Sequence, residues 1–511
     1  MSSDQTPPGP GRKKEREKSL THRTVDGLLW SVSGSLVQIA LRMVVLAILA
    51  RLLTPAEFGI VGAAMIIISL TEIFGHLGVA QAVIQRPNLT EQHIRSGIVI
   101  SLLFGLVTGI LLYLLADPIS RLLGIEESKR SIELLALCFP LKGLSSVAEA
   151  LLTRWMNFKA ISLINVVSYV LGYAPITLIL AFYDMGVIAL IVGQLAQVFL
   201  TSALQLYFAR HHWGLGLNKK ASSELLFFGG GQSLARIGNQ IAQNADYFVV
   251  ARWLGAEALG IYTRAYQIMM QPTNVLASTA ERVLFPAMSS IQSQHERIAY
   301  GYKMTVAMIA MTTLPTSAVL IVFAPEIIRI LLGSQWTAAI IPFQILSATL
   351  VCRTGYKAIG TLARAKGAIY QTAWRQFLYA AMVICGALLG QNYGVNGVAA
   401  GVAGAIAIQF LVMHSFGLRI SGMKALELLT IHARHLAATL VLTSTIVSCK
   451  LVMASFGWGD IPVLMTGLAA AGAVYLLMLI GLPRIFGEEG IWAKKILSQY
   501  SERALQFAKR A

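Results

Sequence analysis

Polar and charged side chains recur every three or four residues inside long apolar stretches of this sequence. In one stretch Lys142, Ser146, Glu149 and Thr153 follow this spacing, which places them on one face of a helix. Nine ionisable residues in such stretches are candidate site residues, six of them basic and three acidic: Arg42, Lys142, Arg236, Arg264, Arg353, Lys357, Glu72, Glu149 and Asp246.

The excess of basic residues over acidic ones indicates the chemistry of this set. A charge at the centre of a bilayer costs roughly 2.5–3.5 kcal/mol, so these residues must pair or face water. Pairing leaves basic residues over, and the six basic residues are therefore predicted to bind an anionic ligand. The three acidic residues are candidates for ion coupling or for pairing. Any single member fits a structural role equally well, such as an interhelical ion pair or a basic side chain that reaches the membrane surface.

No motif for covalent chemistry accompanies these residues. The sequence lacks the serine-hydrolase, zinc-protease and nucleotide-binding signatures, and Gly229–Gly231 lack the strand–turn–helix context of a phosphate loop. Its cysteines stand singly and form no metal-binding cluster. We therefore predict that the protein is not an enzyme and holds no cofactor or metal.

The composition points to helices in a membrane. Of 511 residues, 56% are hydrophobic and only 13% are charged, about half the charged share of a soluble domain. Apolar runs such as 98–116 and 462–482 reach the roughly 20 residues that cross a bilayer as a helix. The net charge of +17 is then explained by loops that face the cytoplasm rather than by nucleic acid. An all-α polytopic membrane protein is predicted.

Apolar runs and loop residues together predict about fourteen transmembrane helices. Alternate loops carry about 25 and about 6 Lys and Arg residues, which places both termini in the cytoplasm. An even number of spans agrees with that topology. The predicted regions are a basic cytoplasmic tail at 1–26, an N-lobe of six spans at 27–209, a cytoplasmic linker at 210–223, a C-lobe of six spans at 224–418, two further spans at 433–483, and a cytoplasmic tail at 484–511 that is either amphipathic or simply solvated.

An internal repeat supports the division into two lobes. Residues 50–60 read ARLLTPAEFGI, and 201 positions later residues 251–262 read ARWLGAEALGIY. The helices before the two phrases carry polar faces that match at the same offset of 201. Arg42 corresponds to Gln243, and Ser35 corresponds to Arg236. A second pair of similar phrases is LADPISRLLG at 115–124 and FAPEIIRILLG at 323–333. Two six-helix repeats of the same orientation, with two C-terminal helices added, are predicted.

The quoted phrases, with NADYFVVARWLGAEALGIYTRAYQI and ERVLFPAMS, resemble a known family. They are similar to the polysaccharide transporters, the Wzx-type and colanic-acid-exporter-like flippases, of the multidrug/oligosaccharidyl-lipid/polysaccharide exporter superfamily. The resemblance implies a bacterial inner-membrane protein with two helical bundles around a central cavity. It also implies alternating access and export of undecaprenyl-diphosphate-linked oligosaccharides for exopolysaccharide or lipopolysaccharide synthesis.

The resemblance leaves partners and related functions open. It implies membrane lipid and a lipid-linked oligosaccharide as partners, and a polysaccharide polymerase and export machinery as further ones. A multidrug or organic-cation antiporter and a peptidoglycan-precursor flippase of the same superfamily are alternatives. A membrane polymerase or ligase is a rival of another class, but the longest outward loop, of about 14 residues, is short for such an enzyme.

Overall fold

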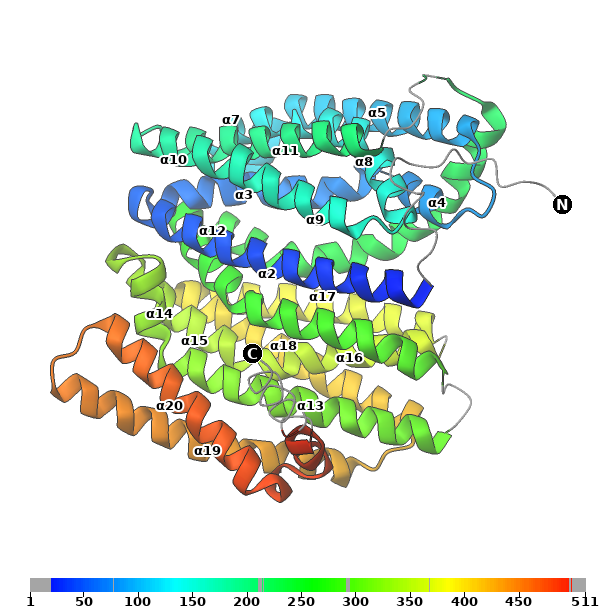
Figure 1. Cartoon of the computed structure of the whole chain (residues 1–511). Coiled ribbons are helices and arrows are strands. Elements are labelled where there is room, and N and C mark those ends of the chain that lie inside the picture. The colour runs from blue at the N-terminus through cyan, green and yellow to red at the C-terminus, as the bar shows by residue number, and fades with distance from the viewer. Residues whose placement is uncertain are drawn as a thin grey trace, which may run out of the picture. The chain divides into compact units, whose positions relative to one another are not determined.

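The computed structural model describes the backbone of most of the chain (Figure 1). The described residues are 20–76, 78–209, 214, 216–290, 295–366, 368–495 and 498. Within them, the side chains that are not described are those of 20–32, 72–76, 226–239, 242, 275–290, 295–296, 364–365 and 369–370. Every regular element in these ranges is a helix, which confirms the predicted all-α fold class.

The chain divides into two compact units, Met1–Thr263 (unit 1) and Arg264–Ala511 (unit 2). The helices that begin in unit 1 are α2 (Leu20–Leu52), α3 (Pro55–His76), α4 (Val79–Gln85), α5 (Glu91–Leu114), α6 (Ala116–Leu123), α7 (Ser128–Leu135), α8 (Cys138–Arg154), α9 (Phe158–Val167), the π-helix η1 (Ser168–Tyr173), α10 (Ala174–Phe182), α11 (Val187–Ala209) and α12 (Lys219–Ser290). Helix α12 is interrupted at Gly255, whose φ of 83° is outside the helical region.

Unit 2 continues with helices only. They are α13 (His295–Val322), α14 (Ala324–Leu331), η2 (Ser334–Ala339), α15 (Ile340–Ala348), α16 (Leu350–Ala365), α17 (Ile369–Gly390), η3 (Gln391–Tyr393), α18 (Gly394–Ser421), α19 (Ala425–Ser455), α20 (Asp460–Gly481) and η4 (Pro483–Phe486). The unit boundary at Thr263 falls within α12, whereas the sequence places the linker between lobes at 210–223. The lobe bounds at 27–209 and 224–418 therefore stay a prediction from the sequence.

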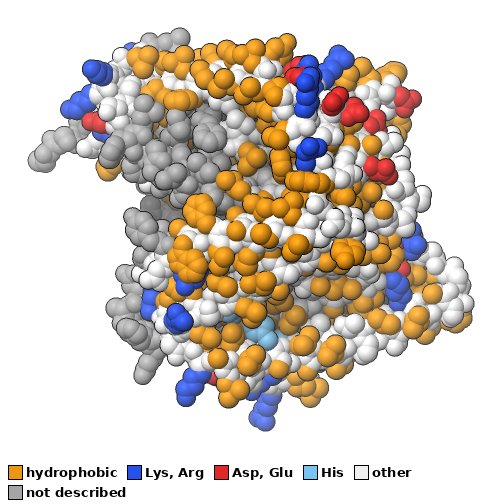
Figure 2. All heavy atoms as spheres, turned by 180° about the vertical axis from the view of Figure 1, so that it is seen from behind, with side chains coloured by type: hydrophobic (Ala, Val, Ile, Leu, Met, Phe, Trp, Pro, Cys, Tyr) orange, Lys and Arg blue, Asp and Glu red, His pale blue; other side chains and the backbone are white. Residues whose placement is uncertain are grey.

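Long apolar helices make this a multi-pass membrane protein. Within the described residues, nine helical segments are long and apolar enough to span a bilayer, and η2–α15 with α16 forms a tenth that is bent by 44°. The apolar runs at 98–116 and 462–482 lie almost entirely within α5 and α20. Many large apolar side chains are exposed, and Figure 2 shows them covering much of one face. Lipid is the environment in which such a surface is stable.

Four stretches are less regular than the hydrophobic pattern suggests. The apolar stretch Phe158–Phe182 contains the six-residue π-helix η1, and the bent pair Ser334–Ala348 and Leu350–Ala363 contains the bend of 44°. The similar phrases at 115–124 and 323–333 each form a short helix, α6 and α14, rather than a plain connection. Hydrophobic length detects a span, but it carries no information on hydrogen-bond pattern within the helix.

The repeated phrases pack against each other reciprocally in unit 1. A Cβ atom added to Gly59 would lie 1.7 Å from the carbonyl oxygen of Ala256, and one added to Gly260 would lie 1.8 Å from that of Pro55. Gly260 lies 201 positions after Gly59, and Ala256 lies 201 positions after Pro55. The two corners thus make the same contact in opposite directions, as expected for two-fold related copies.

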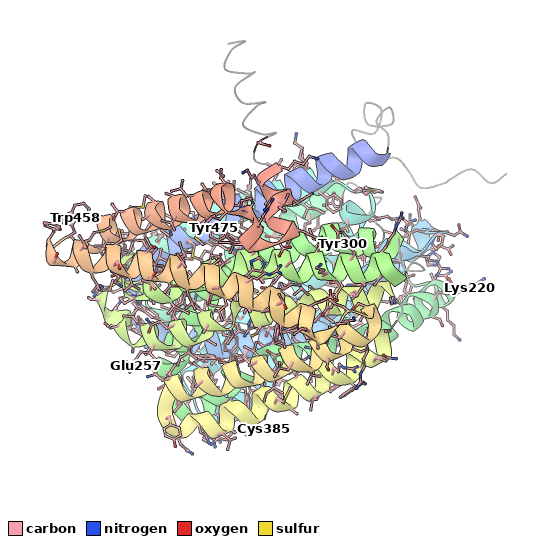
Figure 3. The ribbon with its side chains drawn as sticks, turned by 90° about the horizontal axis from the view of Figure 1, so that it is seen from below. Lys220, Glu257, Tyr300, Cys385, Trp458 and Tyr475 are labelled. Carbon is pink, nitrogen blue, oxygen red and sulfur yellow. The ribbon has the colours of Figure 1, made fainter. Side chains whose placement is uncertain are left out.

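Helices α19 and α20 form an antiparallel hairpin at the end of unit 2, with Trp458 at its turn (Figures 1 and 3). Polar contacts join this hairpin to α13 and α14. Lys450 Nζ lies 2.9 Å from Glu326 Oε2, and the Tyr475 hydroxyl donates to the Met311 carbonyl oxygen at 2.5 Å. The predicted additional pair of spans is therefore an integral part of unit 2.

Candidate functional site

A polar cavity of about 530 Å³ lies among the helices of unit 1. Its lining comes from α2, α4, α8, α9 and α11. Among the described side chains, two basic and one acidic group border it: Arg42, Lys142 and Glu149. The structure therefore brings together three of the nine predicted site residues in a cavity with a net basic lining.

A π-helical turn positions Arg42. Its guanidinium carbon lies 5.7 Å from the centroid of the Tyr169 ring, within the range of a cation–π interaction. Tyr169 belongs to η1, is 5% exposed and stacks on Tyr173 at a centroid distance of 5.2 Å. The wider turn of a π-helix redirects side chains locally, and here the buried Tyr169, stacked on the half-buried Tyr173, supports the cation at the edge of the cavity.

Helix α8 supplies the other two charges. Lys142 and Glu149 lie two turns apart on the face that also carries Ser145. Ser145 Oγ donates to Ser202 Oγ at 3.0 Å, and this bond fixes α8 against α11. Neither Arg42 nor Glu149 forms an ion pair within the described residues, so both keep their charge available to the cavity.

Carboxamide and hydroxyl side chains form the rest of the described polar lining, and the sequence analysis did not single out the carboxamides. On α11, Gln194, Gln197, Thr201 and Gln205 follow the three-to-four-residue spacing of one helical face. The full set of carboxamides is Gln38, Gln81, Asn165, Gln194, Gln197 and Gln205. The signal was present in the spacing, but a search for charged residues passes over it.

Arg353 lies in unit 2 in a different environment. It is 4% exposed, its Nη1 donates to the Tyr266 hydroxyl, and its guanidinium carbon lies 4.8 Å above the Tyr266 ring. Its Nε and Nη2 have no hydrogen-bond partner within the described residues. On the next turn, Tyr356 packs against Tyr379 at a centroid distance of 5.5 Å. We call Arg353 with these three tyrosines the Arg353 cluster.

The remaining predicted residues are dispersed. Asp246 is 2% exposed and accepts a hydrogen bond from the Tyr262 hydroxyl at 2.9 Å. Arg264 donates to the Gln267 side chain, and Lys357 is half-buried one turn after Arg353. The side chains of Glu72 and Arg236 lie outside the described residues. No cluster of three metal-binding side chains occurs in the part of the chain that the structure describes.

Comparison with known proteins gives the family. Residues 48–341 match the family described as "Polysaccharide biosynthesis protein". The lipopolysaccharide biosynthesis protein WzxC of Escherichia coli (strain K12) is 26% identical over 389 residues, which cover 75% of this chain and 78% of WzxC. The succinoglycan biosynthesis transport protein ExoT of Rhizobium meliloti (strain 1021) is 27% identical over 314 residues, which cover 61% of this chain and 63% of ExoT.

Among solved structures, the lipid II flippase MurJ in an inward closed conformation has a similar fold. The TM-score is 0.73 at 17% identity, and the match covers 88% of this chain and 97% of MurJ. At that identity the likeness concerns the fold alone. It confirms the fold class that the sequence predicted, and the family match extends over more than half of the chain. The chain belongs to the family of polysaccharide biosynthesis proteins, as its resemblance to the polysaccharide transporters predicted.

Proposed function

We propose that this protein is a flippase that moves undecaprenyl-diphosphate-linked oligosaccharides across the bacterial inner membrane. The observation that carries the proposal is the unit 1 cavity, which offers cations for a diphosphate and carboxamides for sugar hydroxyls. Relatives named for lipopolysaccharide and succinoglycan biosynthesis support a polysaccharide substrate, and the name of ExoT supports transport rather than catalysis.

In the proposed mechanism the charged head group enters the cavity while the prenyl chain stays in lipid. Arg42 and Lys142 attract the diphosphate, and Arg353, Lys357, Arg264 and Arg236 are further candidates from the sequence. Ion binding or titration at Glu72, Glu149 or Asp246 biases alternating access. Both termini face the cytoplasm in this scheme, and a polymerase and export machinery on the outer side take up the product.

A transport assay in proteoliposomes tests the proposal. Purified protein is reconstituted with a labelled undecaprenyl-diphosphate-linked oligosaccharide, and the arrival of the glycan in the opposite leaflet is measured with an enzyme that cannot cross the membrane. We expect protein-dependent transfer of this lipid. No transfer, together with transport of a peptidoglycan lipid precursor or of a cationic dye, would instead favour one of the two alternative transporters.

The lining of the cavity already favours the oligosaccharide over an organic cation. A site for organic cations is expected to be acidic and aromatic. Among the described residues that line the cavity, Glu149 is the acidic side chain and two basic side chains oppose it. This electrostatic argument supports an anionic head group as the ligand.

A further inference from the structure

We propose that the carboxamides of the unit 1 cavity form a saccharide subsite for uncharged sugar units, separate from the cations that bind the diphosphate. The inference rests on the proposed function and adds that different side chains of the cavity bind the sugar and the diphosphate. The residues of this saccharide subsite are Gln38, Gln81, Asn165, Gln194, Gln197 and Gln205.

The first argument is that one helix of the lining, α11, carries neutral polar groups only. The charged side chains of the lining come from α2 (Arg42) and α8 (Lys142 and Glu149). Helix α11 contributes no ionisable side chain to the lining, only carboxamides, hydroxyl groups and apolar contacts. A ligand in this cavity therefore meets charge from α2 and α8 and neutral polar groups along α11.

The second argument is that four of the six carboxamides are not engaged elsewhere within the described residues. The side chains of Asn165, Gln194, Gln197 and Gln205 form no hydrogen bond with the protein within the described residues. Polar side chains that serve only the fold are usually bonded to backbone or to other side chains. Gln205 is only 6% exposed, so its amide is committed to the cavity rather than to bulk solvent.

The third argument is chemical complementarity. A sugar hydroxyl both donates and accepts a hydrogen bond, and a carboxamide offers a donor and an acceptor side by side. A carboxylate can only accept and an ammonium can only donate. Six carboxamides in about 530 Å³ thus match a neutral, hydroxyl-rich unit better than a second anion.

A backbone contact between η1 and α11 also supports the saccharide subsite. A Cβ atom added to Gly172 of the π-helix η1 would lie 3.0 Å from the Cα atom of Gln197, so the two backbones touch. The same π-helix carries Tyr169 beneath Arg42. One irregular turn thereby holds an element of the saccharide subsite and an element of the diphosphate site in a fixed relation.

The test compares two ligands that differ only in the glycan. Equilibrium binding in detergent is measured for undecaprenyl diphosphate with its oligosaccharide and for undecaprenyl diphosphate without sugar. The variant Gln194→Met with Gln197→Met is expected to bind the glycosylated lipid about tenfold more weakly and the bare lipid as wild type does, because each lost hydrogen bond contributes about 0.5–1.5 kcal/mol. The single variant Gln194→Met, with a smaller effect of the same kind, serves if the double variant fails to fold.

A matched control and a second readout complete the design. Gln371→Met removes an exposed carboxamide in unit 2, outside the cavity, and should change neither affinity. Raising the salt concentration should weaken binding of the bare lipid and leave the loss caused by the Gln variants unchanged, because neutral hydrogen bonds are not screened. Equal losses for both lipids, or no loss for either, would overturn the saccharide subsite. Wild-type protein that binds neither lipid would overturn the proposed function itself.

Discussion

The two units place intramembrane charge in opposite settings. In unit 1, Arg42, Lys142 and Glu149 border a polar cavity, whereas in unit 2 Arg353 is 4% exposed and packed on Tyr266. Acidic residues show the same contrast. The Asp117 side chain of α6 is 39% exposed and pairs with Lys129 of α7, whereas the Glu326 side chain of α14 is 6% exposed and pairs with Lys450 of α19. Side-chain spacing is similar in both units, but burial makes the charges available to a ligand in one and part of the structure in the other.

The largest expected effect concerns transport through unit 1. Arg42→Gln with Lys142→Gln should lower the rate of oligosaccharide-lipid transfer about a hundredfold, since each charged hydrogen bond to the diphosphate is worth roughly 1.5 kcal/mol. Thermal stability should hardly change, because neither charge is buried. Transfer in proteoliposomes and thermal unfolding measure the two quantities. Transfer at the wild-type rate would show that the cations of the unit 1 cavity do not serve transport, and the two units would then differ in the burial of their charges alone.

The next effect concerns the buried pair of unit 2. Lys450→Met leaves Glu326 buried without its closest cation and should lower the free energy of unfolding by about 2 kcal/mol, somewhat less than a fully buried pair because Lys450 is 25% exposed. Lys129→Met in unit 1 is the matched control, and we expect at most a slight fall in melting temperature there. Similar losses in both variants would show that burial does not distinguish the two pairs.

A smaller effect of opposite sign is expected at the Arg353 cluster. Arg353→Met removes a buried charge whose Nε and Nη2 have no partner within the described residues, while it keeps an apolar side chain of similar length. The protein should become about 1 kcal/mol more stable, because a well-packed apolar group avoids the desolvation cost of an ion. Thermal unfolding measures the change. A clear loss of stability would mean that a partner compensates the guanidinium, and the two units would then differ less than their burial indicates.

Sequence reasoning reached the fold and part of the site for different physical reasons. The helices follow from apolar length, and the corner at Gly59 and Gly260 follows from the repeat. Lys142 and Glu149 were found because i, i+3 and i+4 spacing defines a helical face independently of the rest of the chain. The carboxamides of α11 obey the same rule but carry no charge, so the search for ionisable residues did not reveal them.

Other features depend on contacts that spacing does not encode. The support of Arg42 by Tyr169 requires the π-helical turn η1, which the hydrophobic pattern does not distinguish from an α-helix. Arg353 meets Tyr266 from a helix 87 positions earlier in the chain. Whether a basic residue faces a cavity or an aromatic ring is decided by such tertiary contacts. The seven predicted residues whose side chains the structure describes therefore separate into a cavity group and a dispersed group.

The smallest expected effect is a pH dependence of the ion pair between Asp117 and Lys129 in unit 1. The hydrogen bond from Lys129, at 3.1 Å, holds the pKa of Asp117 below its ordinary value, and the charge of Arg121 acts in the same direction against partial desolvation. A carboxyl with a lowered folded-state pKa contributes stability above its unfolded pKa, near 4, and loses it as the pH falls through the folded value. Asp117→Asn should therefore match wild type in melting temperature at pH 3 and fall slightly below it at pH 6. The difference should shrink in high salt, because the pair is exposed. A difference in melting temperature between wild type and Asp117→Asn that persists at pH 3 would show that Asp117 acts by packing rather than by charge. Helix α6 would then resemble α14 more closely than the exposure of its acidic residue suggests.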